Sequence, residues 1–369
     1  MHGEYGNVKA RAAVLEEVGK ISIREFEVPS IGPDEALLKV EMAGICGTDA
    51  KLYHGKLAAP LPLVLGHEIL GTIAEIGEGA SRRYGVRAGD RVIVEGSVPC
   101  WSCAYCLSGQ FRFCQSKRAY GTGTPITVPP SLWGAMADYM YLAPGSAVHR
   151  IPSHIPARVA VLAKGVLANG VQWIRIKGEV ALGATVVIQG AGAQGLAAVV
   201  IARDSGAGTI IVTGLRQDSE RLSLARELGA DHVLVAGEED VVERVREITG
   251  GAMADLVLDV TGSPAAIESS VQVVRRLGTI VLGGLTGKET RTSLLLDHLV
   301  WNEVRVQGVF SKGSEAVLGA IRFIERKARQ YPLDRIISHI YPLERAEEAI
   351  RAVGGDIPGM FPIKAALVP

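Results

Sequence analysis

The sequence predicts an α/β protein in which an antiparallel, barrel-like β region precedes a doubly wound parallel sheet. Roughly the first 150 residues contain short apolar strands separated by glycine and proline turns. This pattern is typical of antiparallel sheets. From about Gly183 apolar strands alternate with helical segments, which is typical of a parallel sheet. A chain of 369 residues is long enough for two domains.

The antiparallel region is expected to contain strands broken by tight turns such as Ile31-Gly32-Pro33 and Ala88-Gly89-Asp90. The strands expected there are Ala12–Glu16, Ile21–Val28, Glu35–Ala43, Thr72–Ile76, Arg91–Glu95 and Tyr139–Leu142.

The parallel region is expected to alternate strands with helices such as Ser219–Leu228 and Val241–Thr249. Its expected strands are Thr185–Gln189, Thr209–Thr213, His232–Val235, Leu256–Val260, Thr279–Leu282 and Val304–Val309. Two further helices, Glu315–Arg329 and Glu344–Val353, are expected before a last strand, Ile363–Leu367.

The composition excludes some classes of partner. Lys plus Arg and Asp plus Glu both number 39. Because the chain has no net positive charge, we expect no binding to nucleic acid. The chain does not open on a basic segment followed by an apolar one, and we expect a cytoplasmic protein. The uncharged stretch Val180–Ala202 is long enough to span a bilayer. Its glycines and glutamines favour a strand, a turn and a buried helix instead, so we expect no membrane partner.

Four of the five cysteines form one cluster. Cys100, Cys103, Cys106 and Cys114 have the spacing C-x2-C-x2-C-x7-C, which suits four thiolates around one tetrahedral Zn²⁺. Disulfide pairing is the alternative, but no other feature indicates an oxidising compartment. Because four protein ligands leave no position open for substrate, such a zinc ion is expected to be structural.

A glycine-rich turn follows the first strand of the parallel region. It reads Gly190-Ala191-Gly192-Ala193-Gln194-Gly195 and opens a helix. In a G-x-G-x-x-G turn the first glycine permits the tight turn, the second lets a pyrophosphate approach, and the third packs helix on strand. The helix N-terminus favours the phosphate anion. We therefore predict dinucleotide binding at Gly190, Gly192, Gln194 and Gly195.

The end of the second parallel strand bears on the choice of coenzyme. An NAD site places an Asp or Glu there to bind the ribose hydroxyls. Here Gly214 occupies the expected acidic position, and Arg216 follows it. This pattern favours the 2′-phosphate of NADP over NAD. Alternatively, Arg216 is a solvated loop residue and Asp218 reaches the ribose.

With these features placed, the chain resembles the zinc-containing medium-chain alcohol and polyol dehydrogenases over essentially its whole length. The resemblance is carried by the cysteine cluster, the glycine-rich turn, Cys46-Gly47-Thr48-Asp49, and Gly66-His67-Glu68-x-x-Gly71 with Gly77. It implies a GroES-like catalytic domain over residues 1–155, with a zinc lobe at about 95–118. It further implies a Rossmann NAD(P)-binding domain over 156–309 and a return to the catalytic domain over 310–369. A small alcohol or ketone substrate and a homodimer or homotetramer are also implied.

Cys46 and His67 are candidate ligands of a second, catalytic zinc. Such a site needs three protein ligands and an open position, and thiolate and imidazole suit this ion. Singly, the two residues could be a buried apolar thiol and a core histidine, but their motifs favour the ligand interpretation. Thr48 matches the residue that passes the alcohol proton outward, and Asp49 could orient the His67 ring. Glu68 matches a residue that approaches the metal in some members.

The third ligand of the family, a Cys, Glu or Asp, is missing at its usual place. The corresponding segment aligns Gly165, or after a shift of one residue Lys164, with that ligand. Neither suits zinc, because glycine has no side chain and an ammonium group has no free lone pair. No Cys, Asp or Glu occurs between Ile151 and Gly178.

Three explanations remain open for this gap. Glu68 and a water could complete a zinc site with Cys46 and His67. Alternatively, Lys164 replaces the metal and, with a lowered pKa, transfers a proton. Thirdly, Lys164 points to solvent and the site is degenerate.

The expected function is therefore zinc-assisted hydride transfer between NAD(P) and a secondary alcohol or polyol and its ketone. The alternatives are a metal-free reductase of a ketone, imine or activated alkene that uses Lys164 and Thr48, and an inactive dinucleotide-binding protein.

Overall fold

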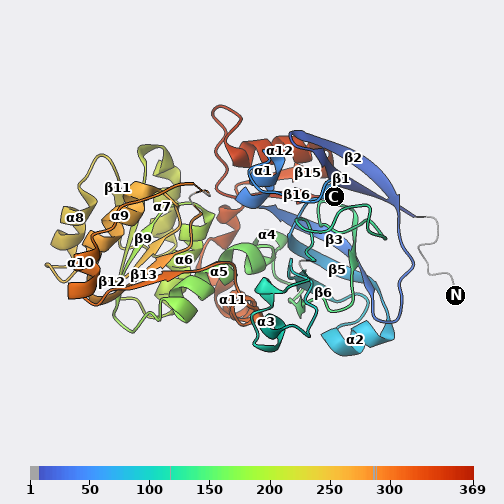
Figure 1. Cartoon of the computed structure of the whole chain (residues 1–369), viewed down its shortest axis with the longest axis horizontal. Coiled ribbons are helices and arrows are strands. Elements are labelled where there is room, and N and C mark those ends of the chain that lie inside the picture. The colour runs from blue at the N-terminus through green and yellow to red at the C-terminus, as the bar shows by residue number, and fades with distance from the viewer. Residues whose placement is uncertain (1–7, 117, 286, 288) are drawn as a thin grey trace. The chain divides into compact units, whose positions relative to one another are not determined.

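The computed structural model describes residues 8–116, 118–285, 287 and 289–369, and Figure 1 shows the arrangement of its helices and strands. Contacts divide the chain into two compact units. Unit 1 extends to Gly165 and also contains Ile321–Arg326 and Leu333–Pro369, and unit 2 comprises Val166–Ala320 and Lys327–Pro332. Unit 1 holds mainly antiparallel sheets and unit 2 a parallel sheet, which confirms the predicted fold class.

Unit 1 contains two sheets. The larger has the order β15-β16-β3-β5-β6-β8, with β7 also paired to β3, and the smaller has the order β2-β1-β4. All of these pairs are antiparallel except β15 with β16. The strands are β1 (Lys9–Glu17), β2 (Lys20–Glu27), β3 (Ala36–Ile45), β4 (Leu63–Val64), β5 (Glu68–Ile76), β6 (Arg91–Val94), β7 (Tyr139–Leu142), β8 (Val148–Arg150), β15 (His339–Pro342) and β16 (Ala365–Val368).

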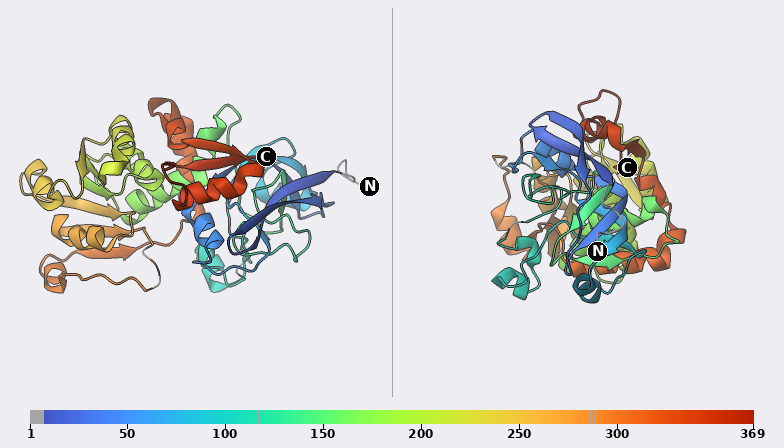
Figure 2. Two further views of the ribbon diagram at one scale, coloured as in Figure 1. Left: turned by 90° about the horizontal axis from the view of Figure 1, so that it is seen from above. Right: turned by 90° about the vertical axis from the view of Figure 1, so that its right-hand side faces the viewer.

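Short helices connect the strands of unit 1. They are α1 (Gly47–Tyr53), α2 (Glu78–Tyr84), α3 (Ala104–Leu107), α4 (Ala157–Ala160) and α12 (Ala346–Gly354), with 3-10 turns η1 (Phe111–Phe113), η6 (Leu333–Ile336) and η7 (Leu343–Arg345). Figure 2 shows the C-terminal elements, in red, beside the N-terminal strands, in blue. Because β16 pairs with β3, the last residues of the chain complete the larger sheet.

The pairing of β3 with β5 sets the position of two motifs. Gly44 of β3 lies opposite Glu68, the first residue of β5. Cys46 directly follows β3, and His67 directly precedes β5. Two motifs that are more than 20 residues apart in the sequence therefore meet at one end of this strand pair.

Unit 2 is built on a six-stranded sheet with the order β11-β10-β9-β12-β13-β14. Every strand pair in it is parallel. The strands are β9 (Thr185–Gln189), β10 (Thr209–Gly214), β11 (His232–Val235), β12 (Ala254–Asp259), β13 (Val274–Leu282) and β14 (Arg305–Gly308). The order of the strands reverses between β9 and β12, and ligands of such sheets bind beyond the carboxyl ends of the strands at this point.

The helices of unit 2 include four that pack against its sheet, α6, α7, α8 and α9. The bounds are α5 (Ala168–Gly170), α6 (Ala193–Asp204), α7 (Ser219–Glu227), α8 (Val241–Ile248), α9 (Pro264–Val273) and α10 (Leu296–Trp301), with the π-helix η3 (Val171–Lys177) and the 3-10 turns η4 (Arg216–Asp218) and η5 (Ala328–Gln330). Two elements have residues in both units, the π-helical turn η2 (Ala163–Leu167) and helix α11 (Ser314–Lys327).

Two apolar segments have the length of a membrane span. The stretch Val180–Ala202 forms β9 and α6 with the glycine turn between them, as the sequence predicts. The helical segment Ala157–Lys177, for which the sequence analysis names no element, is also long and apolar enough to cross a membrane. Since 83% of its most apolar window is buried inside the protein, it has the character of a core helix.

We predict that Gly195→Ala destabilises the protein. A Cβ at this position would lie less than 3.0 Å from the carbonyl oxygen of Gly190, which is backbone and has little freedom to move. Overpacking of this kind costs about 1–3 kcal/mol, and urea denaturation should show a loss near the upper end.

Gly192→Ala is the matched control. No atom of the described residues lies within 4 Å of a Cβ there, so its free energy of unfolding should stay within about 0.5 kcal/mol of wild type. Equal losses in the two variants would contradict this packing role of Gly195.

Candidate active site

Three potential metal ligands converge in unit 1. The Sγ atom of Cys46, a ring nitrogen of His67 and a carboxylate oxygen of Glu68 all lie within 4.8 Å of one another. Cys46 and His67 are partly buried, and Glu68 is buried. The register of β3 against β5 produces this cluster, because it sets the residue after one strand beside the residues that open the other.

Asp49 connects Cys46 and His67. It is fully buried in α1, and its Oδ2 accepts a hydrogen bond from the Cys46 backbone N–H at 2.8 Å. Its Oδ1 lies 3.3 Å from Nδ1 of His67. Burial lowers the pKa of His67, but the Asp49 carboxylate and the Cys46 thiol outweigh burial and raise this pKa to about 9. Asp49 therefore lies beside the Nδ1 side of the His67 ring.

Neighbouring groups lower the pKa of the Cys46 thiol. Burial raises the pKa of its thiol, while His67 and the charge of Lys364 lower it, and the result is a pKa of about 7. Thr48 places its Oγ1 3.7 Å from the Cys46 sulfur. The hydroxyl that the sequence assigns to proton transfer therefore lies beside the cluster.

Glu68 is held from three sides. Nζ of Lys364 lies 2.8 Å from Oε1 and 2.7 Å from Oε2 of its carboxylate. Burial raises the pKa of Glu68, but the positive charges of Lys364 and His67 outweigh it and lower the pKa to about 2. A Cβ at Gly44 or at Gly165 would lie less than 3.0 Å from the carboxylate. Glu68 is therefore ionised and closely confined.

Lys164 is buried, with 6% of its surface exposed. The third explanation, in which Lys164 points to solvent, is thus wrong, and the reason is a specific contact. Its Nζ donates a hydrogen bond to the backbone carbonyl oxygen of His67 at 2.6 Å. Burial lowers the pKa of Lys164. The ammonium group therefore fixes the backbone of a candidate ligand.

The cluster fits a zinc ion by its chemistry. Thiolate, imidazole and carboxylate are the three donor types that zinc takes, and a site with three protein ligands keeps one position open for substrate. Ligand atoms on one zinc ion lie roughly 3.3–3.8 Å apart, so the span of 4.8 Å requires only a small contraction. Lys364, the charge partner of Glu68, was missed from the sequence, because a lysine about 300 residues away carries no local signal.

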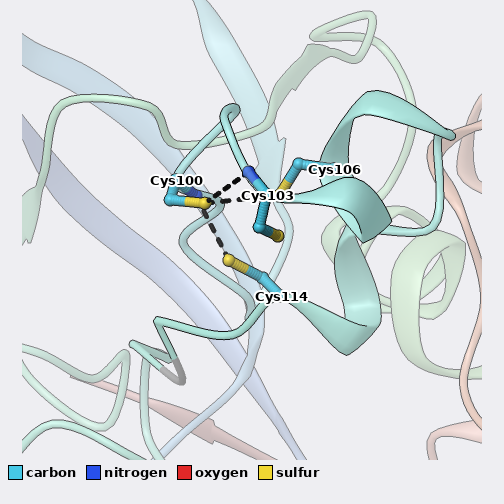
Figure 3. Close-up of side chains that lie close together, drawn as sticks. All are labelled: Cys100, Cys103, Cys106 and Cys114. Carbon is cyan, nitrogen blue, oxygen red and sulfur yellow. Dashed lines mark hydrogen bonds between the residues drawn. The ribbon is translucent and has the colours of Figure 1, made fainter.

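The four clustered cysteines form a second candidate metal site. Figure 3 shows their side chains converging, with Cys103 and Cys106 at α3 and Cys114 after η1. All four are free thiols, and the sulfurs of Cys100 and Cys106 are 3.9 Å apart. Hydrogen bonds with Ser102 lower the pKa of Cys100 to about 5. These sulfurs are arranged for a shared ion, in keeping with the zinc prediction.

The glycine-rich turn of unit 2 has the geometry that phosphate binding requires. Gly190 follows β9 with φ of +111°, a conformation that L side chains rarely adopt. Gly192 is the N-cap of α6 and leaves open space where a side chain would stand, as judged from the described residues. Gly195 packs so closely on Gly190 that a Cβ would collide with its carbonyl. The oxygen of the Gln194 side chain accepts a hydrogen bond from Asn169 at 3.1 Å.

The end of β10 presents one exposed cation. The Arg216 side chain is 86% exposed and forms an ion pair with Glu238, a partner that the sequence analysis missed. Asp218 is engaged locally, since its Oδ2 accepts from the Leu215 N–H at 3.0 Å and its Oδ1 pairs with Arg221 at 2.8 Å. Gly214 ends the strand without a carboxylate. Arg216 is thus free to turn toward a ligand at low cost.

Comparison with protein families gives two matches that cover most of the described chain. Residues 32–153 match the family model "Alcohol dehydrogenase GroES-like domain". Residues 193–326 match the family model "Zinc-binding dehydrogenase". The first match contains both candidate metal clusters, and the second begins inside the glycine-rich turn.

Individual proteins extend this similarity to the whole chain. A Mycobacterium tuberculosis protein named "Probable alcohol dehydrogenase adh" is 38% identical, over 97% of this chain and 98% of its own length. The erythritol/L-threitol dehydrogenase of Mycolicibacterium smegmatis is 31% identical, over 98% of each chain. Among solved structures, a zinc-binding dehydrogenase from Sinorhizobium meliloti 1021 bound to NADP has a TM-score of 0.87 and 27% identity, covering 98% of this chain and 100% of its own.

We predict that Lys364→Met destabilises the metal-free protein by about 3–5 kcal/mol, because it removes the only ion-pair partner of the buried Glu68 carboxylate among the described residues. Urea denaturation at neutral pH measures this loss. The pKa of Glu68 is lowered to about 2, so its contribution to stability is present above the ordinary pKa of glutamate, about 4.3, and disappears as the pH falls toward 2.

The double variant Glu68→Gln/Lys364→Met removes both charges and serves as the control. It should recover most of the lost stability and show a smaller loss in acid. If the free energy of unfolding of Lys364→Met were within about 1 kcal/mol of wild type, the importance of the Glu68–Lys364 pair would be contradicted.

Proposed function

The chain belongs to the zinc-type medium-chain alcohol dehydrogenase family, and we propose that this NAD(P)-dependent enzyme transfers a hydride between NAD(P) and a secondary alcohol or polyol and its ketone. The observation that carries the proposal is the convergence of Cys46, His67 and Glu68 on one point. The similarity to an erythritol/L-threitol dehydrogenase supports a polyol substrate.

In this proposal Cys46, His67 and Glu68 hold the catalytic zinc. When bound there, the ion would polarise the alcohol and lower the pKa of its hydroxyl. Thr48 moves the hydroxyl proton outward through its Oγ1, which already lies beside the Cys46 sulfur. Asp49 keeps the His67 ring in the tautomer that leaves its other nitrogen free for the metal. Cys100, Cys103, Cys106 and Cys114 hold the structural zinc.

Lys164 has a positioning role in the proposed mechanism. A metal-free reductase would need its ammonium group for proton transfer to substrate. In the structure this group is used by the backbone carbonyl of His67. We therefore assign Lys164 to holding the ligand loop in place, and the convergence of Cys46, His67 and Glu68 supports the zinc-assisted mechanism.

The coenzyme is assigned to the turn formed by Gly190, Gly192, Gln194 and Gly195, with its pyrophosphate at the N-terminus of α6. Gly214 offers no carboxylate to the ribose, and Arg216 offers a guanidinium to a 2′-phosphate. We propose a preference for NADP on this ground. Glu238 opposes this preference, because its carboxylate competes for Arg216.

We expect the purified enzyme to hold two zinc ions per chain and to reduce NAD(P) with members of a panel of secondary alcohols and polyols. Cys46→Ser should leave one zinc per chain and lose turnover, because the remaining ion belongs to the four-cysteine cluster. Plasma mass spectrometry counts the zinc, and absorbance of the reduced coenzyme follows turnover.

One zinc ion in both proteins would rule out the catalytic metal at Cys46. If the panel also gave no turnover with wild type, an inactive dinucleotide-binding protein would be the better description.

We expect Arg216→Ala to weaken NADP binding by roughly 10- to 100-fold, since a hydrogen bond to a charged group contributes about 1.5–3 kcal/mol. NAD binding should hardly change. Titration of the fluorescence of the reduced forms, NADPH and NADH, measures both affinities.

Glu238→Gln is the complementary variant, because it releases Arg216 and removes the competing carboxylate. It should strengthen NADP binding or leave it unchanged. Equal losses of NAD and NADP affinity in Arg216→Ala would refute the assignment of Arg216.

A further inference from the structure

We propose that the carboxylate of Glu68 stands in the volume that a side chain of residue 165 would fill, so that the third metal ligand is supplied by β5 and glycine at position 165 is the condition for it. This inference rests on the proposed zinc site at Cys46 and His67. It adds that a side chain at position 165 and the Glu68 carboxylate compete for the same space, although the two positions are almost 100 residues apart in the sequence.

The first support is the space around Gly165. A Cβ on this residue would lie less than 3.0 Å from the carboxylate carbon and from both oxygens of Glu68. Real Cβ atoms essentially never come so close. The Cα–Cβ direction of residue 165 therefore points at the Glu68 carboxylate, and that carboxylate lies within 4.8 Å of the ligand atoms of Cys46 and His67. A side chain at position 165 and Glu68 in its present rotamer exclude each other.

The second support comes from β3, on another side of Glu68. Gly44 is paired with Glu68 in the sheet, and a Cβ there would also lie less than 3.0 Å from a carboxylate oxygen. Two glycines, one on β3 and one on the π-helical turn η2, therefore leave the space that the Glu68 side chain occupies. A carboxylate confined in this way cannot rotate far from Cys46 and His67.

The third support is the charge environment of the carboxylate. Lys364, buried directly before β16, contacts both oxygens of Glu68. Its ammonium group holds the carboxylate in place beside Cys46 and His67. Lys164, the neighbour of Gly165, is committed to the His67 carbonyl and does not compete for the position. Glu68 is thus the anion that completes a thiolate, imidazole and carboxylate set.

The test moves the carboxylate from one position to the other. Zinc per chain and zinc affinity, measured by chelator competition, are compared in wild type, Glu68→Ala, and the double variant Glu68→Ala/Gly165→Asp. We expect two, one and two zinc ions per chain, the four-cysteine site supplying the constant one. The loss of affinity in Glu68→Ala should exceed the roughly 10- to 100-fold effect of removing a group that only orients a ligand.

Glu68→Ala/Gly47→Asp is the matched control. It adds the same charge beside Cys46, but on an exposed residue with no described atom within 4 Å of a Cβ, and it should keep one zinc ion. Gly165→Ala is a second, smaller probe that does not depend on folding of the aspartate variant. It should weaken zinc binding at least tenfold when Glu68 is present, and have little effect in the Glu68→Ala background.

The outcomes separate this inference from the proposed function. Two zinc ions in both wild type and Glu68→Ala would overturn the inference and leave the zinc enzyme intact. A folded Glu68→Ala/Gly165→Asp variant that binds only one zinc ion would refute the claim that a carboxylate at position 165 can replace that of Glu68. A single zinc ion in wild type, unchanged by Cys46→Ser, would refute the catalytic metal itself and the inference with it.

Discussion

The register of β3 against β5 is the constraint on which the candidate active site depends. With Gly44 opposite Glu68, the residue that follows one strand and the residues that open the other come together. Since side chains alternate along a strand, a slip by one residue would turn the ligands to the other face. The pairing of β16 with β3 then brings Lys364 to the same place from the end of the chain. One sheet therefore assembles residues from three distant segments.

Burial of charge gives this site its chemical character. Asp49, Glu68, Lys164 and Lys364 are all buried, and an isolated buried charge is strongly unfavourable. Each of them faces a partner: Asp49 faces Cys46 and His67, Glu68 faces Lys364, and Lys164 faces a backbone carbonyl. Such pairing adds little net stability, but it fixes donor atoms in a space too small for other rotamers. The result is a set of candidate metal donors whose atoms lie within 4.8 Å of one another.

The proposed coenzyme site is built differently, from glycine backbone and exposed side chains. Its phosphate-binding part is built from backbone, with Gly190 in a left-handed conformation and Gly195 packed on it, so glycine is required for steric reasons. Its selective part is built from exposed side chains, Arg216 and Glu238, whose mutual ion pair contributes little to stability. In the proposed site the first part holds the pyrophosphate. The second part can exchange partners, and we propose that it distinguishes one coenzyme from the other.

The two kinds of sheet, the glycine-rich turn, the cysteine cluster and the candidate ligands Cys46 and His67 could all be predicted from the amino-acid sequence. These features depend on local spacing: strand periodicity, turn residues and short motifs are legible within about ten residues. The surroundings of Glu68 could not be predicted in this way, because they depend on long-range packing. Gly44, Gly165 and Lys364 meet there because strand pairing and the π-helical turn bring them together. Lys164 likewise gained a buried partner that no local pattern indicates. Long-range packing selects such contacts by shape and charge, and neither quantity is encoded in the neighbours of a residue along the chain.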